Sequence, residues 1–411
     1  MTFDKTKIKH SGRDSNLESL LYSEHIVNIE KLVVGGAGLA RLQYQERSLV
    51  VFIPLAATAD KLKIKITSIE KNHLIGEITE IITPSPSRRE PPCEYFKSCG
   101  GCSWQHIEET EQVRQKEQIL VDLLSKNIPD VSFNLLPTIV SEKNFNYRNR
   151  IQLKQKGTDL GYFKKASHQI VDISSCLIAQ VEISEQIPVI KKILDPTNEL
   201  KKFELRINHL NQFEYYLIGE DAEGLSFSQV NSAINKKLVQ KIVELVKAVN
   251  PKFLTELYGG AGNFSFPLLS EISNVCIESV EMNFKLTTFA TKELIKQRLQ
   301  KRFFMFTTDC ESFVERRALS KEFILLDPPR MGCSEKVLNK IIAANSEYLL
   351  YVSCHPAFLV RDLKKILKAR PSYIIKTLQI FDMFPQTDHF ETLVLLSQNQ
   401  AVDDAFSPVN N

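Results

Sequence analysis

The 411-residue sequence lacks both a strong charge bias and a long apolar run. Its 52 basic residues nearly balance its 49 acidic ones. This excludes a protein that binds nucleic acid with its whole surface, so any such surface must be local. The longest apolar stretch, "LVVFIPLAATA" (49–59), is shorter than the roughly 20 residues of a membrane-spanning helix. The polar N-terminal residues also lack the apolar segment of a signal peptide. We therefore expect a cytoplasmic protein that does not bind membranes.

Cysteine is the scarce residue that carries a pattern. The chain has eight cysteines, and in a reducing compartment they serve as ligands, catalysts or core residues more often than as disulfides. "CEYFKSCGGC" contains Cys93, Cys99 and Cys102, and "DISSCLIAQ" adds Cys176. Four thiolates can hold an iron–sulfur cluster or a structural zinc. The spacing does not choose between them, and four unliganded core cysteines are the third reading.

The rest of the chain divides into three zones after a polar tail at residues 1–21. Residues 22–84 contain short alternating stretches that predict a small OB-like β-barrel, with a plain β-sandwich as the alternative. Residues 85–230 contain the cysteine pattern within a mixed α+β domain. Residues 231–411 alternate apolar strands with helices. This alternation is typical of an α/β, doubly wound sheet, which binds ligands beyond the carboxyl ends of its strands.

Glycines and acids follow the first three predicted strands of the last zone. The strand at 253–258 runs into "GGAGNFSF", whose glycines allow a tight turn and close approach of a ligand to the backbone. Glu278 ends the second predicted strand (274–279), and Asp309 follows the third. Because an acid at such a position can hold ribose hydroxyls, the set fits an adenosine ligand. The alternative is a glycine-rich turn with solvated acids.

Three further reactive residues fall at the same predicted edge. Asp327 ends the fourth strand, before two prolines that stiffen the loop. Cys354 follows the strand at 348–353, and Glu391 begins the last strand. We expect these three side chains to meet over one ligand. Cys354 alone is as readily a buried core residue as a nucleophile.

Five motifs occur in an order that resembles the RNA uracil-C5-methyltransferase family. They are "SFSQVN", "ELYGGAGNFS", "LLDPPRMG", "YVSCHP" and "DMFPQTDHFE". The similarity extends over about residues 25–400 and is greatest to the iron–sulfur branch with an N-terminal TRAM domain. It implies a class I, S-adenosylmethionine-dependent methyltransferase domain at 231–411 and a TRAM domain at 22–84. It also implies a [4Fe-4S] cluster on the four patterned cysteines.

The resemblance also implies a cofactor site. Carried over residue by residue, it assigns S-adenosylmethionine to Gln229, Tyr258, Asn263, Glu278, Asp309 and Asp327. Three positions depart from the family's usual residues. Glu256 replaces an aspartate, Gly259 replaces a frequent cysteine, and His355 replaces the Asn or Asp after the nucleophile. None of these changes removes a reacting group.

The implied chemistry explains the reacting groups. Carbon 5 of uracil is too weak a nucleophile to take a methyl group until a thiolate has added to carbon 6, and a base must then remove the carbon 5 proton. The resemblance makes Cys354 the nucleophile and Glu391 the general base, while Asp327 would orient the uracil. Because the thiolate is the reactive form, we expect the site to lower the pKa of Cys354.

A local basic segment predicts RNA contact. Between residues 143 and 170, seven cations oppose the single acid Asp159 and alternate with four aromatic rings. Such a mixture is typical of surfaces that bind phosphates and stack on splayed bases. A solvated basic face is the alternative. The cations are Lys143, Arg148, Arg150, Lys154, Lys156, Lys164 and Lys165.

The sequence thus predicts a monomeric enzyme that methylates carbon 5 of a uridine in RNA, with 23S rRNA favoured by the TRAM-plus-cluster architecture. The same chemistry on the T-loop uridine of tRNA is the close alternative. A non-catalytic RNA-binding protein is disfavoured because both Cys354 and Glu391 are present. A nicotinamide oxidoreductase is disfavoured because the turn at residues 260–265 falls short of G-x-G-x-x-G.

Overall fold

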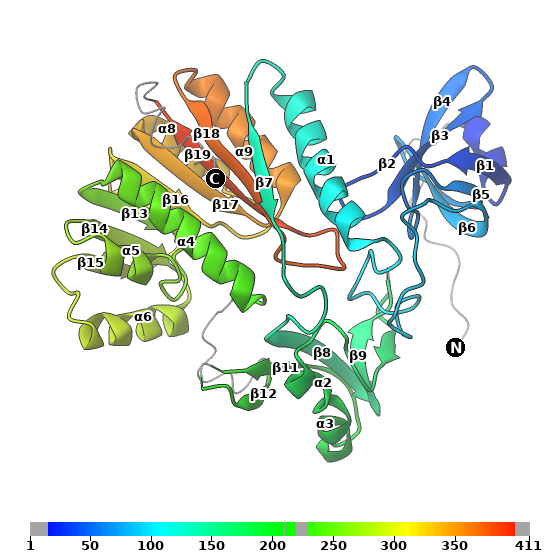
Figure 1. The fold of residues 1–411 in the computed structure, drawn as a ribbon, viewed down its shortest axis with the longest axis horizontal. Coiled ribbons are helices and arrows are strands. Elements are labelled where there is room, and N and C mark those ends of the chain that lie inside the picture. Colours follow the sequence, from blue (N-terminus) through cyan, green and yellow to red (C-terminus); the bar gives the residue numbers. More distant parts are fainter. Residues whose placement is uncertain (1–14, 166, 209, 219–228, 399–411) are drawn as a thin grey trace. The chain divides into compact units, whose positions relative to one another are not determined.

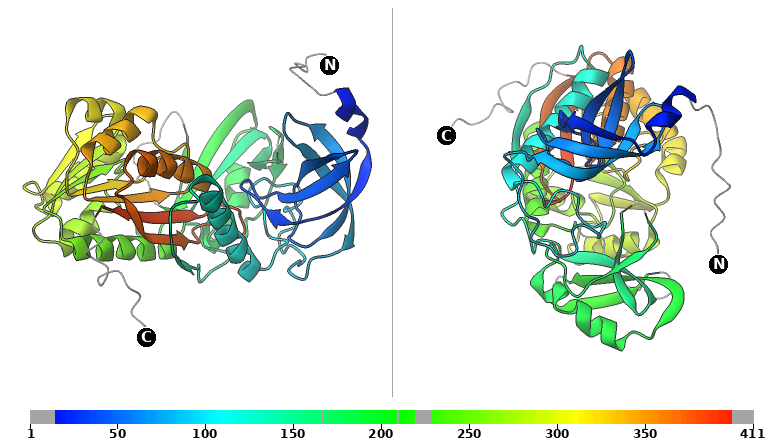
Figure 2. Two further views of the ribbon diagram at one scale, coloured as in Figure 1. Left: turned by 90° about the horizontal axis from the view of Figure 1, so that it is seen from above. Right: turned by 90° about the vertical axis from the view of Figure 1, so that its right-hand side faces the viewer.

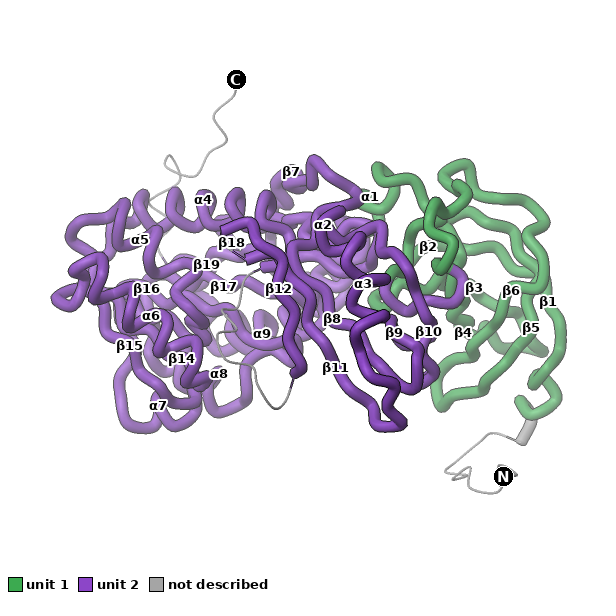
Figure 3. The backbone as a smooth tube through the Cα atoms, turned by 90° about the horizontal axis from the view of Figure 1, so that it is seen from below, with its two compact units in different colours: residues 1–96, 102–115 green, residues 97–101, 116–411 purple. Residues whose placement is uncertain are grey.

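The computed structural model describes residues 15–165, 167–208, 210–218 and 229–398. Most of the predicted polar tail and the first residues of "SFSQVN" lie outside these ranges. The chain forms two compact units, residues 1–96 with 102–115 and residues 97–101 with 116–411 (Figure 3). Within the described ranges, no helix has the length and apolar character needed to cross a membrane.

The first unit contains a six-stranded sheet in the order β1-β5-β6-β4-β3-β2. Alternating side chains bury Ile64 and Ile66 of β5 beside Val51 of β4, as the two-residue period predicts. Leu20 joins this core and is 2% exposed, so the tail predicted for residues 1–21 is wrong at its C-terminal end. Closure into an OB-like barrel stays a prediction. The elements are η1 (Ser15–Leu20), β1 (Glu24–Asn28), β2 (Lys31–Leu32), β3 (Gly38–Tyr44), β4 (Arg47–Ile53), β5 (Lys61–Ile69) and β6 (Leu74–Thr83).

A five-stranded sheet in the second unit has one apolar and one basic face. Its order is β10-β9-β8-β11-β12. Ile151 and Leu153 of β8 are buried on one face, and Arg150 and Lys154 alternate with them on the other. The elements of this region are α1 (Glu109–Asn127), β8 (Arg150–Gly157), β9 (Asp159–Phe163), β10 (Ile170–Asp172), α2 (Val181–Ser184), α3 (Ile187–Ile193), β11 (Thr197–Ile207) and β12 (Phe213–Leu217).

An eight-stranded sheet forms the centre of the second unit, in the order β15-β14-β13-β16-β17-β19-β18-β7. Strands β13 to β17 pair in parallel and β19 runs antiparallel, which confirms the predicted doubly wound α/β fold. One strand was not foreseen, because β7 comes from the predicted central zone and pairs with β18. The strands are β7 (Leu135–Ile139), β13 (Phe253–Leu257), β14 (Cys276–Glu281), β15 (Phe303–Thr307), β16 (Phe323–Leu326), β17 (Tyr348–Ser353), β18 (Ile374–Phe381) and β19 (Glu391–Ser397).

Helices cover both faces of this sheet (Figures 1 and 2). In the left view of Figure 2, the green helix α4 and the orange helix α9 lie on opposite sides of it. Helix α4 buries Ile234, Leu238 and Ile242 at helical spacing. It begins where the side chain of Asn231 accepts a hydrogen bond from the Ile234 amide, and it ends at left-handed Asn250. The helices are α4 (Ser232–Val249), α5 (Ser265–Glu271), α6 (Phe284–Lys296), α7 (Cys310–Arg316), α8 (Glu335–Ala344) and α9 (Pro356–Ala369).

Candidate active site

The carboxyl-end edge of the eight-stranded sheet encloses a cavity of about 790 Å³. The parallel strands β13, β14, β16 and β17 all end here, and antiparallel β19 begins here. Every predicted catalytic or cofactor-binding residue lines the cavity except Glu278. The predicted residues brought together are Gln229, Tyr258, Asn263, Asp309, Asp327, Cys354 and Glu391.

The glycine-rich turn after β13 leaves its backbone open to the cavity. A Cβ added to Gly259 would collide with the hydroxyl of Ser279 and would lie 2.8 Å from Oε2 of Glu256. This crowding requires glycine at position 259. Gly260 has a φ of +57° and open space where a side chain would be. A ligand can therefore approach the main chain of this turn directly.

Glu256 stabilises the same turn through hydrogen bonds to neighbouring elements. Its Oε2 accepts a 2.7 Å hydrogen bond from Ser279 and another from the hydroxyl of Ser265. These bonds connect β13 with β14 and with the start of α5. Burial raises the pKa of Glu256 to about 7, against the opposing effect of the two hydroxyls. The family's first-strand acid is thus retained here as a structural anchor.

The structure corrects the acid of the second strand. Strand β14 continues to Glu281, two residues beyond the predicted end, so the placement of Glu278 at the strand end was wrong. Glu278 forms a 2.6 Å ion pair with Arg317 and does not line the cavity. Glu281 does line it, and its Oε2 accepts a 3.1 Å hydrogen bond from the Gly260 amide. The valine before Glu281 is a strand former, and this was the missed signal.

Tyr258 and Asn263 flank the turn on two sides. Tyr258 adopts a φ of +65°, which is uncommon for a residue with a bulky side chain. Burial raises the pKa of its phenol, and the neighbouring thiols of Cys333 and Cys310 add to the effect. The side-chain amide of Asn263 exchanges two hydrogen bonds with that of Asn235, at 2.9 and 3.1 Å. Both side chains are thus held in place by neighbours outside the turn.

Asp309 and Asp327 occupy opposite electrostatic settings. Asp309 begins α7 and accepts a 2.8 Å hydrogen bond from the Ser312 amide, which lowers its pKa. Asp327 is enclosed in the cavity wall, where burial and the carboxylate of Glu256 raise its pKa to about 7. The cavity therefore has an ionised acid at its exposed end and a readily protonated one inside.

Cys354 and Glu391 face each other because of strand register. Ser353, the last residue of β17, pairs with Thr392 of antiparallel β19. The next opposed residues are Cys354 and Glu391, and both line the cavity. Glu391 is 3% exposed, and its Oε2 has no hydrogen-bond partner among the described residues. A buried carboxylate oxygen is thus available to a ligand beside the thiol.

The expected low pKa of Cys354 is not found. Burial, together with the charges of Glu391 and Asp327, raises it to about 12, against the opposing effects of Arg330 and a backbone hydrogen bond. Burial and Asp327 likewise raise the pKa of Glu391 well above its ordinary value. The prediction overlooked two carboxylates that destabilise a thiolate. It also overlooked Arg330, the cavity cation of the "LLDPPRMG" motif. Positive charge in the cavity is what would favour the reactive thiolate.

His355, the departure after the nucleophile, does not supply a side-chain cap to α9. Its backbone amide donates a 3.2 Å hydrogen bond to Ser353 Oγ, while its buried Nδ1 has no partner among the described atoms. Its ring lies 4.8 Å from that of Phe358. Burial lowers the pKa of His355, which favours the neutral imidazole.

A buried ion pair holds the segment that leads to Glu391. Lys116 of α1 is fully buried and donates to Asp382 at 2.6 Å and to the Phe384 carbonyl at 3.3 Å. The hydroxyl of Tyr147 donates to the carbonyl of Pro385 at 3.0 Å. Residues upstream of the methyltransferase zone therefore fix this loop from outside.

The four patterned cysteines are divided between the two compact units. Within the second unit, Cys99 accepts a 3.4 Å contact from the Gly101 amide, and Cys176 lies 3.8 Å from the Tyr162 hydroxyl. An added Cβ on Gly101 would contact both Cys99 and Tyr162, so these two thiols flank one ring. Cys93 and Cys102 belong to the other unit. In the part of the chain that the structure describes, no three His, Cys, Asp or Glu side chains gather to hold a metal. The [4Fe-4S] cluster stays a prediction.

The solved structures show where this fold occurs. The structure of Pyrococcus abyssi tRNA (uracil-54, C5)-methyltransferase with S-adenosyl-L-homocysteine matches 90% of this chain and all of its own. The TM-score is 0.68 and the sequence identity 19%. At that identity the match establishes the shared fold.

Sequence comparison identifies the family. The model described as tRNA (uracil-5-)-methyltransferase matches residues 214–399. An RNA methyltransferase of Bdellovibrio bacteriovorus is 38% identical over 92% of this chain and 96% of its own. The 23S rRNA (uracil(1939)-C(5))-methyltransferase RlmD of Haemophilus parainfluenzae is 30% identical over 90% of this chain and 95% of its own length. The resemblance inferred from the five motifs is confirmed, and the chain belongs to the RNA uracil-C5-methyltransferase family.

Proposed function

We propose that this RNA uracil-C5-methyltransferase modifies a uridine of 23S rRNA and acts as a monomer. The observation that carries the proposal is the pairing of Cys354 with Glu391 in the cavity that contains the glycine-rich turn. The choice of rRNA is supported by the named RlmD relatives, which align with this chain over 95% of their own length. A tRNA uridine is the alternative, supported by the name of the matching family model.

The cofactor side of the cavity suits S-adenosylmethionine. Open space beside Gly260 admits a ligand to the main chain, and the Glu281 carboxylate lies at the adjacent strand end, where ribose hydroxyls are commonly bound. When bound, the cofactor supplies a methyl group on positively charged sulfur. The residues proposed to hold it are Gln229, Tyr258, Asn263, Glu281, Asp309 and Asp327.

The protein's own groups account for the remaining chemistry. The Cys354 thiolate forms a bond to carbon 6 of uracil, which moves an electron pair toward carbon 5 and makes it nucleophilic. Arg330 favours the thiolate, against Glu391 and Asp327. After methylation, Glu391 removes the carbon 5 proton, and the electrons of that bond expel the cysteine. Asp327, held near both the cysteine and the turn, is proposed to orient the uracil.

We further propose that Cys93, Cys99, Cys102 and Cys176 bind a [4Fe-4S] cluster. The support is the C-x5-C-x2-C spacing and the position of Cys99 and Cys176 beside one tyrosine ring. Methyl transfer requires no electron transfer, so the cluster would organise the chain around its ligands.

The substrate is tested by methyl transfer from labelled S-adenosylmethionine into separate unmodified transcripts of 23S rRNA and tRNAs. We expect 5-methyluridine in 23S rRNA only, identified by nucleoside mass spectrometry. Label in tRNA alone would keep the reaction and overturn the rRNA assignment. Label in neither transcript, from protein that binds S-adenosylhomocysteine, would contradict the proposal as a whole.

Glu281 is tested against Glu278, its matched control three residues away. Removing the charge in Glu281→Gln should weaken cofactor binding by about tenfold to a hundredfold, because a hydrogen bond to a charged group contributes about 1.5–3 kcal/mol. Glu278→Gln should leave the dissociation constant within about twofold. Calorimetric titration with S-adenosylhomocysteine measures both, and the reverse ranking would restore Glu278 as the cofactor residue.

The cluster is tested by metal content after anaerobic purification. We expect about four irons per chain and a brown colour, both lost in Cys99→Ser and Cys176→Ser. Cys276→Ser, a change outside the pattern, should keep its iron. Stoichiometric zinc in the wild-type protein would replace the cluster with a zinc site, and a metal-free, folded wild-type protein would remove both.

A further inference from the structure

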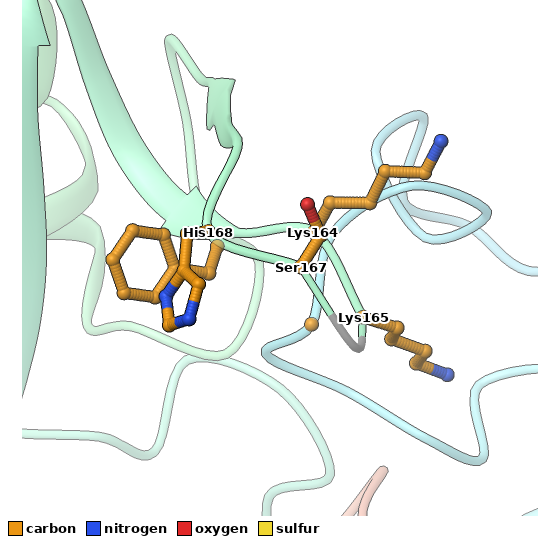
Figure 4. A pocket seen from close by; sticks show the side chains of 6 residues that line it. Lys164, Lys165, Ser167 and His168 are labelled. Atoms are coloured by element: carbon orange, nitrogen blue, oxygen red, sulfur yellow. The ribbon is translucent and has the colours of Figure 1, made fainter. Parts of the chain in front are cut away.

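A second hollow lies away from the catalytic cavity, beside the turn that joins β9 to β10. Its volume is about 570 Å³, and it is lined by Gly100, Phe163, Lys164, Lys165, Ser167 and His168 (Figure 4). Figure 4 shows the two lysine side chains extending from the turn on the side away from the His168 ring. The lining offers ammonium, hydroxyl and imidazole groups but no carboxylate. This chemistry selects an anion.

The turn that carries the two lysines is braced by hydrogen bonds. The Lys164 amide donates to the Gln169 carbonyl at 2.8 Å, and the Ser167 amide donates to the Lys164 carbonyl at 3.1 Å. The Gly100 amide donates to the carbonyl of Phe163 at 2.9 Å. A Cβ on Gly100 would lie 2.6 Å from that same carbonyl, so glycine is required for this approach. These bonds connect both ends of the turn and join it to the chain at Gly100.

Repulsion between two lysines beside the hollow also favours binding of an anion. Lys154 of β8 and Lys202 of β11 are directly opposed across the sheet, and like charges in that position repel. The Lys154 ammonium lies 5.5 Å from the ring centroid of Phe163, which lines the hollow. A bound anion would relieve this repulsion.

The basic face of the sheet connects the hollow with the catalytic cavity. Arg150 lines the cavity, and Lys154 lies four residues along β8 on the same face, a separation of about 13 Å at the usual strand rise. Two acids of this face are engaged, since Glu204 accepts from Gln152 at 3.1 Å and Glu214 pairs with Arg206 at 2.9 Å. A chain of phosphates leading from the cavity would meet cations along this path.

We infer that the hollow lined by Lys164, Lys165 and His168 binds backbone phosphate of the substrate RNA, several nucleotides from the uridine in the catalytic cavity. The inference rests on the proposed RNA methyltransferase function and adds a distinct binding site to it. Lys164 and Lys165 contact phosphate, and Lys154 with Lys202 extends the contact toward Arg150. The site recognises phosphate charge and not base identity, since phosphate contacts position a nucleic acid without reading its sequence.

The double variant Lys164→Ala/Lys165→Ala tests the site. On the transcript that wild-type protein methylates, KM for RNA should rise about twentyfold at 0.1 M salt, since each phosphate contact on a single strand contributes about 0.7 logarithmic unit. The slope of log K against log salt should fall by about 1.4. The kcat at saturating RNA and the affinity for S-adenosylhomocysteine should not change, because neither lysine lines the catalytic cavity.

The matched control is Lys247→Ala/Lys296→Ala, which removes the same charge from exposed positions on α4 and α6. It should leave KM and the salt slope at wild-type values. Equal effects of the two double variants would show that net charge alone acts, and this would overturn the site. Unchanged KM in the Lys164/Lys165 variant would also overturn it, while the methylation of RNA by wild-type protein would stand. Wild-type protein that methylates no transcript would instead remove the proposed function on which the site depends.

Discussion

The direction of the strands is the constraint on which the site depends. Parallel strands β13, β14, β16 and β17 end at one edge of the sheet, so residues about a hundred positions apart in the chain meet there. Antiparallel β19 begins at that edge and places Glu391 opposite Cys354. The glycine-rich turn and the reacting pair therefore share one cavity. No single loop could bring these groups together.

The same convergence concentrates buried acids at this edge of the sheet. Burial raises the pKa values of Glu256 and Asp327 to about 7, and it also raises that of Glu391 well above its ordinary value. The cost of burying Glu256 is reduced because this group can retain a proton near neutral pH. The arrangement also explains why the pKa of the Cys354 thiol is raised, since Glu391 and Asp327 disfavour the thiolate while the Arg330 cation favours it. The reactive thiolate therefore depends on the positive charge of Arg330, which offsets the effect of the two acids on Cys354.

Hydrophobic periodicity and the positions of residues at predicted strand ends were enough to predict much of the fold and site from the sequence. Helix α4 and the positions of Asp327, Cys354 and Glu391 follow from patterns within about 20 residues. What escaped prediction depended on exact ends or distant partners. Glu281 was missed because the strand was ended two residues early. The joining of β7 to the sheet and the burial of Lys116 against Asp382 arise between segments more than 200 residues apart, which no local pattern encodes.

The central claim is that Cys354 attacks uracil and Glu391 releases the product, and a trapped intermediate tests it most directly. Glu391→Gln protein should be incubated with S-adenosylmethionine and the unmodified transcript that wild-type protein methylates. The products should then be examined on a denaturing gel and by mass spectrometry of the linked peptide. The account predicts an RNA–protein adduct that carries the added methyl group, attached at Cys354 and absent from Cys354→Ala/Glu391→Gln. Normal turnover by Glu391→Gln, or an adduct that forms without Cys354, would contradict it.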